Sequence, residues 1–322
     1  HYWFVKAERK AALMVKNMKQ VILQENLKPV STIGIGCMRI ASMNEKEADT
    51  FIHTALDASI NFFDEADIYG GGKSEEVLGT FLHNSPSERE KIFVQSKCGI
   101  RKGFFDFSKE HILSSVDGIL SRLHTDHLDS LLLHRPDILM DVNEVQEAFD
   151  ELYQSGKVLA FGVSNMSSGH MSYLSKYIHQ KLITNQLQVS CAHTPIIDAL
   201  LHVDMHDTWS VDHDGGVLPY MMENGISLQC WSPLQKGYFE GVFLNDTEYK
   251  ELNDTLDAIA SKYKVEKDTI AYAWLLKIPC STQVITGTTK PERILSAAKA
   301  MDIDLTKEEW YQIYTSAGNI LP

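Results

Sequence analysis

The sequence predicts an α/β fold of the (β/α)8 barrel class, a TIM barrel in which eight parallel strands close into a cylinder inside a ring of helices. Short runs rich in apolar and β-branched residues alternate with longer stretches of helical periodicity, an order typical of βα units. Eight such repeats succeed one another over roughly 270 residues, a common length for this barrel. We therefore expect one domain covering residues 18–322.

The individual repeats can be traced along the chain. The expected strands are 33–38, 61–63, 92–96, 130–133, 160–163, 182–186, 227–231 and 283–285. The expected helices are 44–58, 73–83, 108–123, 141–154, 167–177, 214–224, 248–263, 268–277 and 291–300. The first helix has a clear start, because Asn44 is a good N-cap residue and Glu47 occupies the capping-box position three residues later.

An open, doubly wound sheet is the structural alternative. It would place a Gly-rich phosphate-binding turn, G-x-G-x-x-G, directly after the first strand. The chain has Gly34 and Gly36 at the right spacing, but Arg39 stands where the third glycine is needed. The closed barrel is therefore the preferred fold.

Three segments lie outside the repeat. Residues 21–24 and 29–32 are expected to form an N-terminal β-hairpin that closes the bottom of the barrel. Residues 189–213 form a long connection, which we expect to lie as a functional loop over the C-terminal face, where barrel active sites occur. Residues 1–17 differ in character from the rest of the chain, so we interpret them as a leader or extension and leave them out of the fold.

The composition limits the classes of partner and location. Acidic residues outnumber basic ones by 43 to 30, which gives a net charge of −13. Neither nucleic acid nor an anionic membrane surface is then an expected partner, and no apolar run reaches the ~18–20 residues of a membrane helix. The 5 cysteines are odd in number and form no C-x-x-C motif, so we expect reduced thiols in a cytoplasmic protein.

Four polar residues come after three consecutive expected strands. Asp64 and Tyr69 come after the second strand, Lys97 after the third and His134 after the fourth. Taken singly, a strand-end lysine or histidine is commonly a surface or core-edge residue. Because the C-terminal ends of parallel strands meet at one mouth of a barrel, we expect these four side chains to converge on a single site.

The four residue types suit the reduction of a carbonyl group. Addition of a hydride to the carbonyl carbon leaves an alkoxide, and a phenol with a pKa of ~10 still carries the proton that the alkoxide needs. An adjacent ammonium lowers the tyrosine pKa by stabilising the phenolate, and a carboxylate holds that ammonium in place. Histidine can orient the carbonyl oxygen. A positioned acid of this kind accelerates reactions by ~10²–10⁴-fold.

At these residues the chain resembles the aldo-keto reductase family, over essentially all of residues 18–316. The segment Asn-Phe-Phe-Asp-Glu-Ala-Asp-Ile-Tyr-Gly at 61–70 is similar to the signature found after the family's second strand. The resemblance implies that Tyr69 is the general acid, that Lys97 and Asp64 tune it and that His134 orients the substrate. It also implies an oxidoreductase that uses NADPH to reduce an aldehyde, a ketone or an open-chain sugar.

The resemblance further implies where the cofactor binds. Ser164 and Asn165, with Gln186 on the next strand, would hold the nicotinamide carboxamide, and Trp231 would stack on the nicotinamide ring. The other implied contacts are Ser232, Pro233, Leu234 and Gly237 at the pyrophosphate, and Thr288, Lys290 and Arg293 at the adenosine phosphate. Cations and hydroxyls beside a helix N-terminus suit a 2′-phosphate, which favours NADPH over NADH.

Three positions depart from the family pattern. Gly287 stands where many members carry a lysine for the 2′-phosphate, and Ala297 replaces a residue that often contacts adenine. Arg135 comes directly after His134 where tryptophan is frequent, so the substrate pocket is expected to differ. These departures bear on cofactor and substrate preference more than on the reaction class.

Two other functions stay open at this point. Some members of the family use the barrel as a redox-sensing regulatory subunit of an ion channel, although the complete set of four residues argues for an enzyme. The spacing of His202 and His206 can bind zinc on a helix, which would suit a metal-dependent barrel hydrolase. The glutamate usual after the first histidine is replaced by Val203, so we expect no metal.

Overall fold

The computed structural model describes residues 19–322, and the leader expected at 1–17 lies outside the described residues. Eight parallel strands close into one barrel, in the spatial order β10-β11-β12-β3-β4-β5-β8-β9. They are β3 (Ile33–Gly36), β4 (Phe62–Asp64), β5 (Phe93–Cys98), β8 (Ser130–Leu133), β9 (Phe161–Ser164), β10 (Leu182–Gln188), β11 (Ser227–Trp231) and β12 (Gln283–Thr286). The predicted barrel is confirmed, and an open sheet is excluded.

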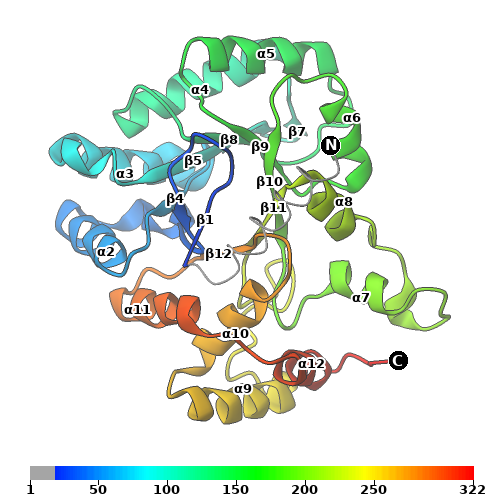
Figure 1. The fold of residues 1–322 in the computed structure, drawn as a ribbon. Helices are drawn as coiled ribbons and strands as arrows, with labels where there is room; N and C mark the ends of the chain where they lie inside the picture. Colours follow the sequence, from blue (N-terminus) through cyan, green and yellow to red (C-terminus); the bar gives the residue numbers. More distant parts are fainter. Residues whose placement is uncertain (1–18) are drawn as a thin grey trace, which may run out of the picture.

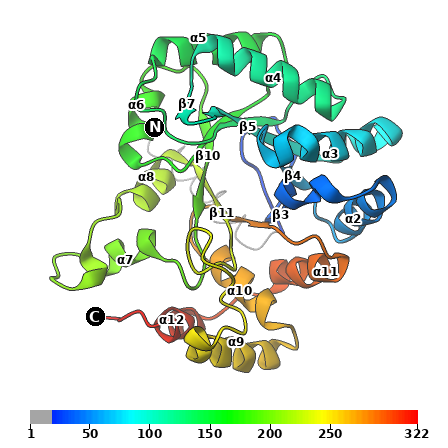
Figure 2. The same ribbon diagram turned by 180° about the vertical axis from the view of Figure 1, so that it is seen from behind.

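Helices surround the strands, as Figure 1 and the reverse view in Figure 2 show. They are α2 (Glu45–Asp57), α3 (Lys73–Asn84), α4 (Lys109–Leu123), α5 (Val142–Gln154), α6 (Ser168–Ser175), α7 (Pro195–Leu201), α8 (Val217–Asn224), α9 (Lys250–Tyr263), α10 (Lys267–Leu276), α11 (Pro291–Lys299) and α12 (Lys307–Ser316). The predicted capping box of α2 is confirmed, since Asn44 and Glu47 each accept a hydrogen bond from the other's backbone N–H. Between residues 19 and 322, no helix is long and apolar enough to cross a membrane.

The barrel interior is filled in layers that reflect the alternation of side chains along each strand. Phe62 and Phe93 stack near the start of β4 and β5, with ring centroids 5.1 Å apart. Two residues further along, Asp64 and Gln95 form a hydrogen bond of 2.7 Å between their side chains, and Lys97 comes next on the same face of β5. The interior of the barrel is therefore apolar near the start of the strands and polar near their C-terminal ends.

The predicted N-terminal hairpin closes the bottom of this barrel. Its strands β1 (Gln20–Val21) and β2 (Val30–Ser31) pair antiparallel. Val21 and Leu23 are buried in one apolar cluster with Phe62 and its neighbours inside the barrel. Full burial of such a side chain stabilises a fold by about 1.5–3 kcal/mol. The hairpin therefore contributes to the stability of the barrel.

The connection between β10 and α8 is more ordered than the sequence suggested. Instead of a long loop, residues 189–213 contain α7 and the short 3₁₀ helix η5 (Thr208–Ser210). The segment also binds the C-terminal end of the chain, because Tyr314 Oη donates to Asp198 Oδ1 at 2.8 Å and Trp209 Nε1 donates to Asn319 Oδ1 at 3.0 Å. Both views place α7 beside α12 at the edge of the barrel (Figures 1 and 2).

Two further elements were not expected. Helix α12 comes after the eighth repeat, and its capping box at Thr306 and Glu309 resembles that of α2. A second hairpin, β6 (Ile100–Arg101) and β7 (Phe104–Phe105), extends the connection after β5. It stands at the C-terminal side of the barrel with both phenylalanines exposed.

Candidate active site

Lys97 is the centre of the site. Its ammonium donates three hydrogen bonds, to Asp64 Oδ2 at 2.7 Å, to the Glu65 carbonyl oxygen at 2.9 Å and to Tyr69 Oη at 3.1 Å. All three protons of the ammonium are thus used. Since Tyr69 Oη accepts from Lys97, its own O–H proton remains available to another acceptor.

The local sequence explains how Tyr69 reaches this position. Asp64 ends β4, and the chain then passes through a short loop into the 3₁₀ helix η3 (Tyr69–Gly72). Gly70, Gly71 and Gly72 have φ values of 58°, 65° and 93°, a left-handed conformation that side chains disfavour. A Cβ on Gly70 would also lie 2.7 Å from the Ala41 Cβ. The three glycines allow the sharp turn that returns the chain to α3 beside the phenol.

His134 completes the group at the end of β8. Its ring meets the Tyr69 ring edge-on, with centroids 6.2 Å apart. Burial holds the pKa of His134 well below its ordinary value, and the positive charges of Lys97 and Arg135 lower it further. His134 is therefore neutral at physiological pH. Asp64, Tyr69, Lys97 and His134 are all brought together at one rim of the barrel.

The electrostatics differ from the simple expectation for Tyr69. Desolvation by burial raises the pKa of Tyr69 above its ordinary value, and Asp64 adds to this, while Lys97 lowers the pKa through its charge and its hydrogen bond. Lys97 therefore acts on Tyr69 in the expected direction, but burial outweighs it and the pKa of Tyr69 is above its ordinary value. For Lys97 itself, burial lowers the pKa, but Asp64 and Tyr69 raise it above the ordinary value. The lysine stays an ammonium.

Two buried glutamines below the site, Gln95 and Gln229, were not found from the sequence, whereas Gln186 was expected only as a cofactor contact. Gln95 and Gln186 both donate to Asp64 Oδ1, at 2.7 and 3.1 Å, and each also donates to Gln229 Oε1. Two amide donors therefore stabilise the carboxylate on the side away from Lys97. The strand alternation that places Gln95 two residues before Lys97 was the signal that could have revealed this layer.

The residues expected at the nicotinamide lie beside His134. Ser164 and Gln186 are neighbours across β9 and β10, and Ser164 Oγ donates to the Gln186 carbonyl oxygen at 3.0 Å. Asn165 Nδ2 donates to the His134 carbonyl oxygen at 3.2 Å, and Trp231 Nε1 donates to Asn165 Oδ1 at 3.0 Å. Within the described chain, Gln186 Oε1 has no hydrogen-bond partner. These residues are therefore linked to His134 through Asn165, and Gln186 Oε1 is left as a free hydrogen-bond acceptor.

The residues expected at the phosphates lie on two neighbouring connections. After β11 the chain forms a short loop that contains Leu234 and Gln235. Ser190 Oγ fixes this loop by donating a hydrogen bond of 2.6 Å to the Gln235 carbonyl oxygen. This turn contains the other expected pyrophosphate positions, Ser232, Pro233 and Gly237.

After β12, the backbone N–H of Lys290 donates to Thr288 Oγ1 at 3.1 Å, just before α11 begins. Lys290 and Arg293 are exposed, and neither forms an ion pair with any residue in 19–322. A Cβ on Gly287 would meet nothing within 4 Å, so the position of the missing family lysine is open space. Two unpaired cations at a helix N-terminus suit a phosphate.

Comparison with known proteins identifies the family of the chain. The family model for the aldo/keto reductase family matches residues 32–316. The chain belongs to the aldo/keto reductase family. Oxidoreductase YdhF of Escherichia coli is 33% identical over 285 residues, covering 86% of this chain and 89% of that protein. The 6-dehydroglucose reductase of Agrobacterium fabrum is 34% identical over 314 residues, covering 93% and 98%.

A solved structure shares the fold of this aldo/keto reductase. The crystal structure of an aldo-keto reductase from Klebsiella pneumoniae in complex with NADPH superposes with a TM-score of 0.74, at 22% identity. The match covers 92% of this chain and 94% of that one. As a member of the family, the protein is an oxidoreductase.

Arg135 packs against two aromatic side chains at the mouth of the barrel in this aldo/keto reductase. Its guanidinium lies 5.7 Å from the ring centroids of both Trp231 and Tyr238. Trp231 and Tyr238 also meet edge-on at 6.4 Å. Cation–π contacts of this kind contribute ~0.5–2 kcal/mol each, so Arg135 helps to fix the aromatic wall. The sequence identified Arg135 as unusual but did not suggest Tyr238.

The zinc hypothesis does not match the geometry of the loop histidines. Helix α7 ends at Leu201, so His202 and His206 do not share a helix. His202 Nδ1 lies 3.0 Å from Asp207 Oδ2, and its Nε2 lies 2.8 Å from the Ile320 carbonyl oxygen. Both ring nitrogens are therefore engaged, which leaves none for a metal.

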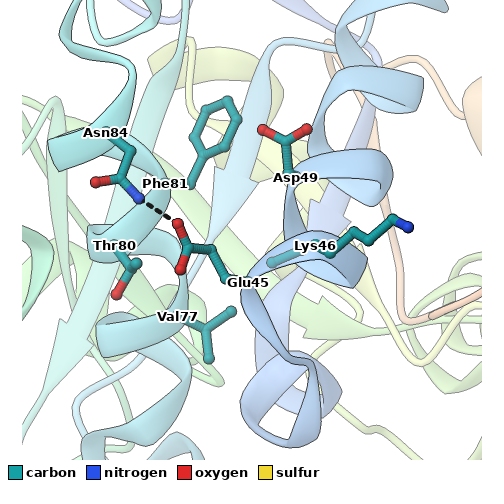
Figure 3. Close-up of a pocket in the computed structure, with 8 residues that line it drawn as sticks. Glu45, Lys46, Asp49, Val77, Thr80, Phe81 and Asn84 are labelled. Carbon is teal, nitrogen blue, oxygen red and sulfur yellow. Dashed lines mark hydrogen bonds between the residues drawn. The ribbon is translucent and has the colours of Figure 1, made fainter.

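A surface pocket lies away from the candidate catalytic residues. It sits between α2 and α3, where Asn84 Nδ2 donates to Glu45 Oε1 at 2.6 Å (Figure 3). Its lining residues are Glu45, Lys46, Ala48, Asp49, Val77, Thr80, Phe81 and Asn84. None of the expected catalytic or cofactor residues is among them.

Proposed function

We propose that this protein reduces the carbonyl group of an aldehyde or ketone to an alcohol, with NADPH as the reductant and Tyr69 as the general acid. The observation that carries the proposal is the three-way bonding of Lys97, which joins Asp64, the backbone and the phenol of Tyr69. The reaction balances as carbonyl plus NADPH plus a proton, giving alcohol plus NADP⁺.

The four side chains have separate roles in this proposal. Tyr69 donates its Oη proton to the carbonyl oxygen as negative charge develops there. Lys97 stabilises the phenolate that remains, and Asp64 keeps the ammonium in position. Neutral His134, edge-on to the phenol, orients the carbonyl oxygen through a hydrogen bond.

NADPH is the proposed cofactor, and when bound it supplies the hydride. The free Oε1 of Gln186, next to Ser164 and Asn165, fits a carboxamide that has both donor and acceptor groups. The exposed cations Lys290 and Arg293, which lie beside Thr288, fit the 2′-phosphate. The NADPH held by the Klebsiella pneumoniae structure is consistent with this proposal.

The substrate is proposed to be a small carbonyl compound such as an open-chain sugar. The name of the Agrobacterium fabrum relative, 6-dehydroglucose reductase, supports the inclusion of sugar carbonyls. The net charge of −13 argues against a nucleic-acid partner. Since the described cysteines are all free and buried, we also propose a cytoplasmic location.

A panel of carbonyl compounds tests the function directly. We expect NADPH absorbance to fall when the protein is mixed with a nitrobenzaldehyde or with dicarbonyl and dehydro-sugar substrates. The regulatory alternative predicts a different result, namely tight NADPH binding, negligible turnover of the whole panel and a stable complex with a partner protein. That result would contradict the enzymatic proposal.

A further inference from the structure

Glu65 is a completely buried acid directly behind the catalytic group. Its backbone carbonyl oxygen accepts one of the three bonds from Lys97 Nζ, at 2.9 Å. Its side chain is 0% exposed and lies against α3, where Oε2 is 2.7 Å from Ser74 Oγ. Among the residues in the structure, no group bonds the other oxygen, Oε1. The side chain of Glu65 thus anchors the peptide that holds Lys97.

The contacts of Ser74 determine where protons must be. Ser74 Oγ lies 2.7 Å from Glu65 Oε2 and 2.6 Å from the Cys37 carbonyl oxygen, and both distances are those of O–H···O hydrogen bonds. A serine hydroxyl has one proton, and a backbone carbonyl has none. If Ser74 donates to Cys37, the bond to Glu65 needs a second proton. Only the carboxyl group can supply it.

The charged and titratable groups around Glu65 also favour a protonated carboxyl group. Cys37 approaches from the 3₁₀ helix η2 (Cys37–Ser42), Asp64 is on the same strand end, Glu75 is on α3 and Lys97 is on β5. Burial raises the pKa of Glu65 well above its ordinary value, and the charges of Glu75 and Asp64 add to this. The hydrogen bond with Ser74 and the charge of Lys97 lower the pKa, but burial outweighs both. An ionised carboxylate with a buried, unbonded oxygen would be strongly unfavourable.

We propose that Glu65 is a neutral carboxylic acid at physiological pH and that it acts as a positioning residue for the Lys97–Tyr69 pair. Its proton goes to Ser74 Oγ, and this bond fixes the Glu65 carbonyl that receives Lys97. Its neutrality leaves Asp64 as the single buried counter-ion of Lys97, so no second negative charge opposes phenolate formation at Tyr69. The effect on rate rests on the proposed function, whereas the protonation does not.

Infrared spectroscopy tests the protonation directly. The difference spectrum between the native protein and Glu65→Gln at neutral pH should contain the C=O stretch of one protonated carboxylic acid. Glu75→Gln is the matched control, because Glu75 is equally buried but accepts from Ser96 Oγ and Arg122 Nε. We expect that control to remove a carboxylate band. Loss of a carboxylate band in Glu65→Gln would overturn the proposal.

Steady-state kinetics test the positioning role. A Gln side chain keeps the donor to Ser74, so Glu65→Gln should retain kcat within about twofold, while Glu65→Leu removes the donor. One lost hydrogen bond corresponds to roughly a fivefold to tenfold fall in kcat, and we expect KM for NADPH to be unchanged in Glu65→Leu. Equal kcat values for the Gln and Leu variants would overturn the positioning role.

If Glu65→Leu fails to fold, a more than tenfold fall in kcat for folded Glu65→Gln would overturn it instead. If the native protein reduces no carbonyl, the proposed function fails, and the infrared result still decides the protonation.

Discussion

Trp231 Nε1 donates a hydrogen bond of 3.0 Å to Asn165 Oδ1, and this bond joins the ends of β11 and β9 across β10. The same asparagine donates from Nδ2 to the His134 carbonyl oxygen. One side-chain amide therefore connects the proposed nicotinamide wall to the residue proposed to orient the substrate.

This bond predicts a specific effect of Trp231→Phe. The variant keeps an aromatic face, removes the N–H donor and reduces the area of the ring. A neutral hydrogen bond contributes about 0.5–1.5 kcal/mol, so we expect NADPH affinity to fall roughly twofold to tenfold. A titration that monitors the fluorescence of NADPH measures this change. Full affinity in Trp231→Phe, with a large loss in Trp231→Ala, would show that the ring face alone matters.

Removal of Lys97 should affect stability as well as activity. Lys97→Met leaves the buried carboxylate of Asp64 without its counter-ion, which costs about 3–5 kcal/mol. We expect the midpoint of urea unfolding to fall accordingly. The double variant Lys97→Met, Asp64→Asn removes the stranded charge and should regain part of the stability while remaining inactive. If the single and double variants are equally stable, the two side chains are not coupled.

Arg293 is expected to discriminate between the two nicotinamide cofactors. Its exposed guanidinium stands at the start of α11 without an ion pair to any residue in the described range. A charge-assisted hydrogen bond is worth about 1.5–3 kcal/mol, so Arg293→Ala should weaken NADPH binding at least tenfold and leave NADH binding nearly unchanged. Equal losses for the two cofactors would remove the proposed 2′-phosphate contact.

We expect His202 to make the attachment of the C-terminal segment depend on pH. The ring lies between two acceptors, the carboxylate of Asp207 and the carbonyl of Ile320, and a neutral imidazole has only one N–H to donate. The hydrogen bond to Asp207 is the largest of the effects that raise the pKa of His202. The protonated form is thus favoured in the folded protein, and Asp198 nearby adds to this.

The sign of the effect is set by the raised pKa. The stabilisation is fully present below the ordinary pKa of histidine, about 6.5, and is lost as the pH rises through the raised pKa. Hydrogen exchange in residues 198–210 and 314–320 should therefore accelerate with alkaline pH more than the intrinsic rate does. His202→Gln should abolish that extra dependence. An unchanged profile in the variant would contradict the ionised state of His202.

The extent to which the sequence predicted the molecule depends on the range of the interactions involved. The eight strands were found within about two residues because each is a short apolar run between polar turns. Asp64, Lys97 and His134 could be placed together because each ends a parallel strand. These inferences need only local pattern and the geometry of a barrel.

The features that the sequence missed depend on contacts between distant segments. Helix α7 is short, and its attachment to residues 314–320 is made through side chains over 100 positions away. The pKa of Tyr69 is raised because burial outweighs the effect of Lys97, a balance that no local pattern reveals. The protonation proposed for Glu65 likewise depends on the distances from Ser74 Oγ to Glu65 and to the Cys37 carbonyl oxygen.

The substitution Tyr69→Phe tests the central claim most directly, because it removes one hydroxyl and keeps the ring that meets His134. Single-turnover reduction of a reactive aldehyde should be monitored by NADPH absorbance, with NADPH affinity measured on the same preparation. We predict that the variant binds NADPH with native affinity and that its reduction rate falls by about 10²–10⁴-fold, the contribution of a positioned acid. Near-native reduction by Tyr69→Phe would contradict the account.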